Sequence, residues 1–227
     1  MEASDVRIEQ EPQVKKKVAV IGGASTRNAA PFNDLTWDIW AFSSLRSHTP
    51  RITRWFEMHA LEDLQEQLLE DTPRRLSYRN YLRFLQELAC PVYMQREYEE
   101  IPYSVEYPLQ AALAAFGKCF SSTAAYLLAL AILEGYHVIG VWGIHLTEKT
   151  VYARQRPGVE YLLGMARQRG IQVCLPKRSP LRIPARPTLP ETAILYGYDW
   201  QTSQAWWRTK RHKNRRSDVG DQKRVKT

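Results

Sequence analysis

The chain has 227 residues, 44% of them hydrophobic, which is enough for one sizeable core and favours a single domain. No apolar run reaches the roughly 18 residues that a membrane span needs, and residues 1–17 are charged and lack the apolar region of a secretory signal, so we expect a cytoplasmic protein with no membrane segment. The formal net charge is +8, but residues 207–227 carry nine Lys or Arg against two Asp, a net of +7, so the rest of the chain is electrically ordinary at +1.

The N-terminal part of the chain predicts a strand followed by a glycine loop. Residues 1–16 show no periodicity and are expected to be flexible, and the apolar run 17–21 predicts a first strand. The loop after it contains Gly22, Gly23, Ala24, Ser25 and Thr26. In an open α/β sheet this is where backbone N–H groups meet a phosphate, although the loop lacks the spacing of both the dinucleotide fingerprint and the P-loop.

Two further strands and two helices are expected in the next third of the chain. Residues 37–42 and 54–59 predict strands, and residues 61–69 and 81–88 predict helices. Glu57 and His59 stand two residues apart and share a face if that segment is extended. A carboxylate beside a histidine is typical of an acid/base pair, whereas a core histidine bonded to the backbone is the structural alternative.

The middle of the chain predicts a short strand at 91–94 and then a loop at 97–108, which is polar and broken by prolines. Three hydroxyl residues, Ser121, Ser122 and Thr123, precede an apolar helix at 124–133, which ends at Gly135 and leads into a strand at 138–142. The helix is expected to be buried on nearly all sides. Its hydroxyl-bearing N-terminus is expected to supply an N-cap and an anion site.

The C-terminal third begins with a polar loop at 147–156 and continues with a helix at 157–169 and a strand at 171–175. A proline-rich linker follows, and residues 193–198 resemble one last strand. The alternation of strands and helices predicts a three-layer, Rossmann-like α/β fold with a mainly parallel sheet over residues 17–200. The segment 1–16 and the basic tail 201–227, which we expect to be disordered, flank this domain.

Two compositional features bear on partners. The cysteines Cys90, Cys119 and Cys174 are odd in number and widely spaced, so neither a disulfide framework nor a zinc site is expected, and dependence on another metal stays open. The tail from Arg208 to Lys226 would add salt-sensitive, sequence-independent attraction to nucleic acid. A solvated end that aids solubility is the alternative.

Three stretches carry a resemblance to known proteins: VAVIGGAST, SSTAAYLLALAILEGYHVIGVWGIH and EYLLGMARQRGIQVCLP. They resemble the bacterial sialyltransferases that use CMP-sialic acid and have a single Rossmann-like domain. They also resemble the pyrophosphokinase-like group that includes the archaeal hydroxymethylpterin enzyme. Small tailed-phage proteins of unassigned function share the WFExH, PVYM and YxxQR stretches with this chain.

The resemblance implies a nucleotide site. By matching position, Gly22, Gly23, Ala24, Ser25 and Thr26 would hold phosphates, and Ser121, Ser122 and Thr123 would face the nucleotide. Gly143 would line the nucleotide edge, with His145 in place of the aspartate that these families carry. Tyr152 and Arg156 would partly replace the long lid of the sialyltransferases and stabilise a leaving phosphate. Because that lid is otherwise missing, sialic acid is not the expected donor.

The resulting hypothesis is a nucleotide-dependent transferase of the glycosyltransferase type. It would move a group from a nucleotide-activated donor, bound as a substrate and not as a tight cofactor, to an acceptor hydroxyl, with phage DNA as one candidate acceptor. His145 or His59 would be the base, and Glu57 would assist His59. The alternative is a non-catalytic nucleotide-binding or phage accessory protein that uses the same pocket. The sequence leaves the oligomeric state open.

Overall fold

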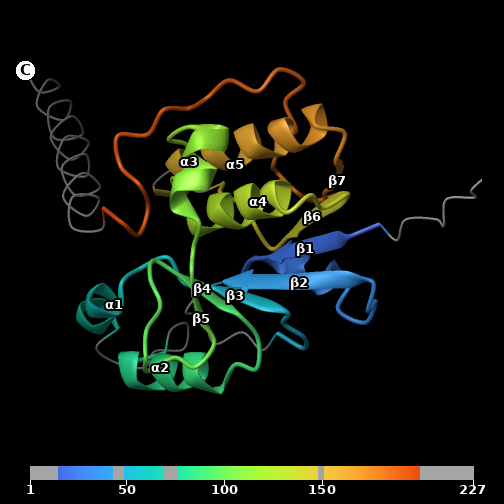
Figure 1. Cartoon of the computed structure of the whole chain (residues 1–227). Coiled ribbons are helices and arrows are strands. Elements are labelled where there is room, and N and C mark those ends of the chain that lie inside the picture. The colour runs from blue at the N-terminus through green and yellow to red at the C-terminus, as the bar shows by residue number, and fades with distance from the viewer. Residues whose placement is uncertain (1–14, 43–48, 69–75, 148–150, 200–227) are drawn as a thin grey trace, which may run out of the picture.

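The computed structural model describes residues 15–42, 49–68, 76–147 and 151–199. They contain a seven-stranded sheet in the order β5-β4-β3-β2-β1-β6-β7, in which every neighbouring pair is parallel (Figure 1). The strands are β1 (Lys17–Ile21), β2 (Trp37–Phe42), β3 (Arg54–Phe56), β4 (Val92–Met94), β5 (Ser104–Glu106), β6 (Val138–Trp142) and β7 (Gln172–Cys174). The predicted α/β fold with a mainly parallel sheet is confirmed.

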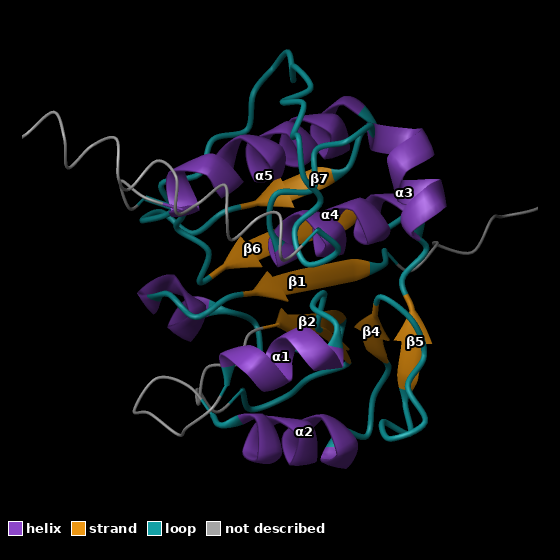
Figure 2. Ribbon diagram, turned by 90° about the vertical axis from the view of Figure 1, so that its left-hand side faces the viewer, coloured by secondary structure: helices purple, strands orange, loops and turns teal. Residues whose placement is uncertain are grey.

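Helices cover both faces of the sheet and complete three layers, as Figure 2 shows. One face carries α3 (Leu109–Phe116), α4 (Thr123–Leu133) and α5 (Val151–Gln168); the other carries α1 (Leu61–Gln67) and α2 (Tyr78–Glu87). A short 3-10 helix, η1 (Ser25–Ala29), follows β1. Successive side chains of β1 alternate between the layers, since Val18 and Val20 pack in the core with α4 and Ala19 and Ile21 pack in the core with α1 and α2.

Helix α4 is buried from Thr123 to Ile132, which explains why its sequence is apolar on all sides. It lies between the sheet and helices α3 and α5. The helix ends as predicted, with Gly135 at a φ of 70°. Ser122 occupies the N-cap position but makes no capping hydrogen bond, so the expected capping role of its side chain is wrong. Within the described residues, no helix combines the length and the apolar character that a membrane crossing requires.

One predicted loop contains a short strand, and one predicted strand has an irregular backbone. The predicted loop 97–108 contains β5, which pairs with β4 at the edge of the sheet; the strand is only three residues long and partly exposed, so it leaves no apolar pattern. The strand-like run 193–198 is not a strand. The N–H of Tyr196 in that run donates to the carbonyl oxygen of Phe120 in the loop before α4, and Gly197 has a φ of 85°.

Helix α5 starts at Val151, six residues before the predicted start, and so includes Pro157 in its interior. A proline removes one helical hydrogen bond, but contacts with the segment before α4 hold this part of the helix. Gly158 packs against the carbonyl oxygen of Cys119, and the carbonyl oxygen of Gln155 accepts a hydrogen bond from the Ser121 hydroxyl. Tertiary packing therefore overrides the local preference.

The flexible segment expected at 1–16 lies almost entirely outside the described residues, as does the tail 201–227.

The close approach of β1 and β6 yields a test based on two glycines with similar backbones. Gly143 and Gly170 have φ values of 69° and 77°, but a Cβ at Gly143 would overlap the Gly22 carbonyl oxygen, whereas none of the described atoms lies within 4 Å of a Cβ at Gly170. Gly170→Ala should lower the free energy of unfolding by about 1–2 kcal/mol through backbone strain alone. Gly143→Ala should lower it by about 1–3 kcal/mol more, because the neighbouring backbone must shift.

Urea unfolding of both variants measures this difference. Equal destabilisation of the two variants would contradict the tight contact between the loops after β1 and β6.

Candidate functional site at the carboxyl edge of the sheet

All seven strands are parallel, so their carboxyl ends lie at one edge of the sheet. The chain fills the sheet from β1 outward to β5 and then returns to place β6 on the other side of β1. In open α/β sheets, ligands bind outside the carboxyl ends of the strands at this point of reversal. The loops that follow β1, β3 and β6 therefore form the candidate site.

The loops after β1 and β6 are joined by backbone hydrogen bonds. The N–H of Gly22 donates to the carbonyl oxygen of Trp142 at 2.8 Å, and the N–H of Ala24 donates to that of Gly143, also at 2.8 Å. These two donors of the predicted phosphate loop are therefore used within the fold. Gly23 and Ser25, on either side of Ala24, are exposed residues of the same loop.

Thr26 links the same two loops through its side chain. Its Oγ1 accepts a hydrogen bond from the N–H of Gly143 at 2.8 Å and lies 3.0 Å from Nε2 of His145. An oxygen that already accepts one hydrogen bond can still donate its own proton to an imidazole nitrogen. Thr26 and His145 thus link the loop after β1 to the loop after β6.

The three hydroxyl residues before α4 are buried in the protein. Ser121, Ser122 and Thr123 are 8%, 4% and 8% exposed. The Ser121 hydroxyl donates to the carbonyl oxygen of Gln155 at 3.2 Å. Within the described part of the chain, Oγ of Ser122 is buried without a hydrogen-bond partner. The Ser122 hydroxyl thus differs from that of Ser121, which is bonded to α5.

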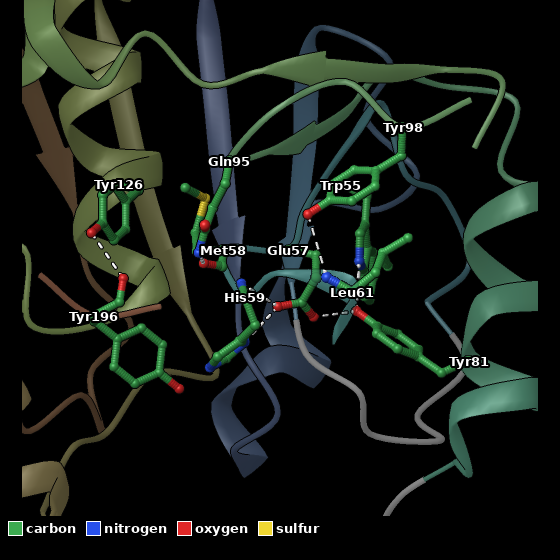
Figure 3. A network of polar contacts seen from close by, with 10 residues as sticks. All are labelled: Trp55, Glu57, Met58, His59, Leu61, Tyr81, Gln95, Tyr98, Tyr126 and Tyr196. Carbon is green, nitrogen blue, oxygen red and sulfur yellow. Dashed lines mark hydrogen bonds and ion pairs between the residues drawn. The ribbon is translucent and has the colours of Figure 1, made fainter. Parts of the chain in front are cut away.

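Glu57 and His59, which follow β3, form a buried, hydrogen-bonded pair. Nδ1 of His59 lies 2.6 Å from Oε1 of Glu57, and the backbone N–H of His59 donates to the same oxygen at 3.0 Å (Figure 3). The side chains of His59 and Glu57 are only 12% and 6% exposed, respectively. The structure therefore brings together the two residues that their spacing singles out, although β3 ends before them, at Phe56.

Two aromatic residues hold the carboxylate of Glu57 from the other side. The Tyr81 hydroxyl donates to Oε2 of Glu57 at 2.7 Å and accepts a hydrogen bond from Nε1 of Trp55 at 3.2 Å. Burial would raise the pKa of Glu57, but the charge of His59 and the hydrogen bonds from His59 and Tyr81 outweigh it and lower that pKa. Burial and the neighbouring Glu57 charge raise the pKa of Tyr81 well above its ordinary value, so the phenol stays neutral and donates.

A C-terminal segment, residues 192–199, covers His59. We call it the Tyr196 segment. The ring centroids of Tyr196 and His59 are 5.0 Å apart in an edge-to-face arrangement, and Figure 3 shows His59 between Tyr196 and Glu57. The carbonyl oxygen of Tyr196 accepts a hydrogen bond from the Tyr126 hydroxyl of α4 at 2.9 Å. A Cβ at Gly197 would overlap the Met58 carbonyl oxygen, so the segment lies directly on the loop after β3.

The two residues expected to stabilise a leaving phosphate lie in the first turns of α5. Tyr152 is 46% exposed. Nε of Arg156 donates to Oε1 of Glu160 at 2.7 Å, and its guanidinium also bonds the carbonyl oxygen of Pro180. The structure therefore gives Arg156 partners that tie α5 to the chain after β7.

Metal binding has no visible support in the described ranges. No group of three or more His, Cys, Asp or Glu residues within them is arranged to hold a metal ion. Cys90 and Cys119 are buried and Cys174 is partly buried, and all three are free thiols. Burial raises the pKa of Cys90 to about 11 and that of Cys119 to about 12, so these thiols are poor metal ligands and poor nucleophiles.

Sequence reasoning missed Tyr81 and Tyr196. Tyr81 lies on a helix that is predicted simply as amphipathic, and Tyr196 lies in a run that resembles a strand. Both residues are distant from the Glu57–His59 pair in the sequence, and folding brings them into contact with it. The concentration of aromatic residues toward the C-terminus is the sequence signal that could have indicated the packing of the Tyr196 segment on the domain.

The chain matches no protein-family model and no curated protein. Similar solved structures are complexes of the sialyltransferase CstII, from Campylobacter jejuni. With cytidine-5'-monophosphate bound, the identity is 16%, the TM-score 0.46, and the coverage 79% of this chain and 88% of that chain. For the complex with CMP-3FNeuAc, the identity is 15%, the TM-score 0.47, and the coverage 78% of this chain and 88% of that chain. For the complex with a trisaccharide acceptor and CMP, the identity is 15%, the TM-score 0.47, and the coverage 79% of this chain and 89% of that chain. Likeness at this level does not identify a ligand or a reaction.

The lowered pKa of Glu57 predicts a specific pH dependence of stability. The folded-state pKa lies below the unfolded value of about 4.3, so Glu57 stabilises the fold above that pH, and this contribution is lost as the pH falls through the folded-state pKa. In Glu57→Gln this part of the pH dependence should be absent, because the side chain no longer titrates. Urea unfolding at a series of acidic pH values measures it.

The control for this experiment is Glu62→Gln, since the side chain of Glu62 is 67% exposed in its ion pair with Arg96. Glu62→Gln should keep the wild-type dependence. The same acid-induced loss of stability in Glu57→Gln and in the wild type would contradict a buried, ionised Glu57.

The Tyr196 contact predicts that this ring shields His59 from reagents. Diethyl pyrocarbonate acylates neutral imidazole, and Tyr196→Ala should accelerate the reaction of His59 because it removes the ring that packs on the imidazole. Tyr196→Phe keeps the ring and should react like the wild type. Mass spectrometry of the peptides measures the rates, with the exposed His137 as the internal reference. Equal rates at His59 in Tyr196→Ala and Tyr196→Phe would show that another group shields it.

Proposed function

We propose that this chain is a nucleotide-dependent transferase of the glycosyltransferase type, in which His59 is the general base. The observation that carries the proposal is the buried pair of Glu57 and His59 at the carboxyl edge of the sheet, with 2.6 Å between Oε1 and Nδ1. A histidine held by a carboxylate is the arrangement that accepts a proton from a hydroxyl in many transfer reactions.

The position of the proton on His59 follows from the charge of Glu57. Because the pKa of Glu57 is lowered, its carboxylate is ionised at neutral pH and can only accept hydrogen bonds. Nδ1 of His59 must then carry the proton in this contact, which leaves the lone pair of a neutral imidazole on Nε2. Nε2 would take the proton of the acceptor hydroxyl, and Glu57 would stabilise the imidazolium that forms.

The donor would lie at the reversal point between β1 and β6. Gly22, Gly23, Ala24, Ser25 and Thr26 follow β1, and Gly143 and His145 follow β6. β3 lies two strands from β1, a distance of roughly 10 Å along the sheet. An extended nucleotide-activated donor at β1 and β6 would thus place its transferred group toward His59. The acceptor oxygen would form the new bond, and the nucleotide would leave with the electron pair of the broken one.

Contacts of the hydroxyl residues before α4 fit a supporting role in this scheme. Ser122 has a buried, unpartnered Oγ in the described structure, whereas Ser121 is engaged with α5. We therefore place Ser122 ahead of Ser121 and Thr123 as a contact for the donor. The same reasoning places His59 ahead of His145 as the base, since Nε2 of His145 is engaged with Thr26.

One observation favours a second candidate, a protein that binds a nucleotide without transferring a group. Arg156 is engaged with Glu160 and Pro180, and Tyr152 is 46% exposed; within the described residues no hydrogen bond joins either side chain to the loops after β1 and β6. A transferase needs a group that stabilises the charge of the departing phosphate. In this alternative, the same loops would hold a nucleotide and His59 would have no chemical role.

The two candidates differ in turnover. With a panel of nucleotide sugars and with DNA and small sugars as acceptors, the wild type should bind a nucleotide and release it from the donor. His59→Asn should lower the rate of release by about 10²- to 10⁴-fold, the usual contribution of a general base, and leave nucleotide affinity within about twofold. Calorimetry measures the affinity, and chromatography measures the released nucleotide.

The matched control is His137→Asn, because His137 precedes β6 at the opposite edge of the sheet and contacts the backbone of Lys16. This variant should keep the wild-type rate. Binding without release in the wild type would replace the transferase by the binding protein, and an absence of binding to every nucleotide tested would refute both.

A further inference from the structure

Positive charge is concentrated in one stretch of the described chain. Residues 161–190 contain six Lys or Arg and no Asp or Glu. They are Arg167, Arg169, Lys177, Arg178, Arg182 and Arg186. Since residues 1–200 carry +1 in total, the other 170 of them carry −5. A body that is nearly neutral overall therefore has a strongly basic region.

This region is built from the end of α5 and the stretch 176–190, which we call the proline strap. The strap runs along α5: the carbonyl oxygen of Pro180 bonds Arg156, the N–H of Arg182 donates to Oε1 of Glu160 at 2.9 Å, and Nε2 of Gln168 donates to the carbonyl oxygen of Ala185 at 3.5 Å. Figure 1 shows this stretch, in orange, passing over α5. The contacts fix the strap along the outer side of the helix.

All six basic residues are exposed, and the guanidinium of Arg169 lies over the ring of Phe116. We call the other five, Arg167, Lys177, Arg178, Arg182 and Arg186, the basic row. The strap contacts extend from Arg156 to Gln168, which is about 18 Å along the helix axis. The carboxylate of Glu160 already accepts hydrogen bonds from Arg156 and from the backbone of Arg182. Among the described residues, no ion pair joins a side chain of the row to a carboxylate.

We propose that the basic row is a docking surface for the phosphate backbone of nucleic acid. Four of its five residues are arginines, whose planar guanidinium binds phosphate oxygens in pairs. The strap contacts span about 18 Å of α5, a length that matches roughly five phosphates of one strand at 3.4 Å each along the axis.

The row offers little to other classes of partner. Among the large hydrophobic residues of the described strap, Leu189 is the exposed one, at 36%. Most protein interfaces and membrane-bound helices combine charge with an apolar contact area, and in the described strap no large hydrophobic residue is more exposed than Leu189. The prolines at 176, 180, 184, 187 and 190 restrict the backbone of the strap, so little conformational entropy is lost on binding. The contact reads no sequence, because it addresses phosphates and not base edges.

The test uses the full chain and a short mixed-sequence DNA duplex, with affinity measured by fluorescence anisotropy over a range of salt concentrations. Removing two phosphate contacts with the double variant Arg182→Gln, Arg186→Gln should lower the slope of log affinity against log salt by about 1.8. The matched control is Arg79→Gln, Arg83→Gln, which makes the same charge change at two exposed residues of α2, on the other face of the sheet. The control should keep the wild-type slope.

Two outcomes would overturn the proposal. Equal changes of slope in both double variants would show that net charge alone matters. An unchanged slope in the strap variant, with a loss in Lys223→Gln, Arg224→Gln, Lys226→Gln, would assign binding to the C-terminal tail. All replaced strap and α2 side chains are exposed, so thermal unfolding of each variant should match the wild type and exclude a folding defect. The readout is independent of any transferase activity.

Discussion

The pairing of β1 with β2 on one side and with β6 on the other is the constraint on which the rest of the structure depends. It reverses the direction in which the sheet is filled and brings the loops after β1 and β6 into contact. Gly22 and Gly143 approach so closely that neither has room for a side chain, and Thr26 bridges the same two loops. Because parallel strands end at one edge, the Glu57–His59 pair after β3 lies along the same edge.

The buried carboxylate of Glu57 shows how a polar group is stabilised at that edge. A buried charge is unfavourable unless it is paired and hydrogen-bonded. Here the imidazole and the N–H of His59 meet one oxygen, and the Tyr81 hydroxyl, itself held by Trp55, meets the other. Replacing such a group by well-packed apolar residues is often neutral or stabilising, so core stability alone does not explain the arrangement. It orients a histidine, which is what proton transfer requires.

The chain after β7 contains no helix or strand in its described part, yet it joins the two surfaces to which we assign functions. The proline strap lies along α5 and presents the basic row. The Tyr196 segment then crosses to the carboxyl edge, where it contacts α4, the loop after β3 and His59. The N–H groups of Thr192 and Tyr196 donate to the carbonyl oxygens of Lys118 and Phe120, so the loop between α3 and α4 holds this irregular stretch in place.

The sequence by itself determined the strands β1, β2 and β6 to the residue and the buried helix α4, because dense apolar runs bounded by glycine or polar residues leave few alternatives. It also singled out Glu57 and His59 by their spacing, while the roles of the proposed site residues and the resemblance to pterin enzymes and phage proteins stay predictions. Only the tertiary structure decided that β5 pairs at the edge, that α5 continues through Pro157, and that Tyr81 and Tyr196 flank the Glu57–His59 pair. These features depend on contacts between residues far apart in the chain, and local periodicity contains no information about such contacts.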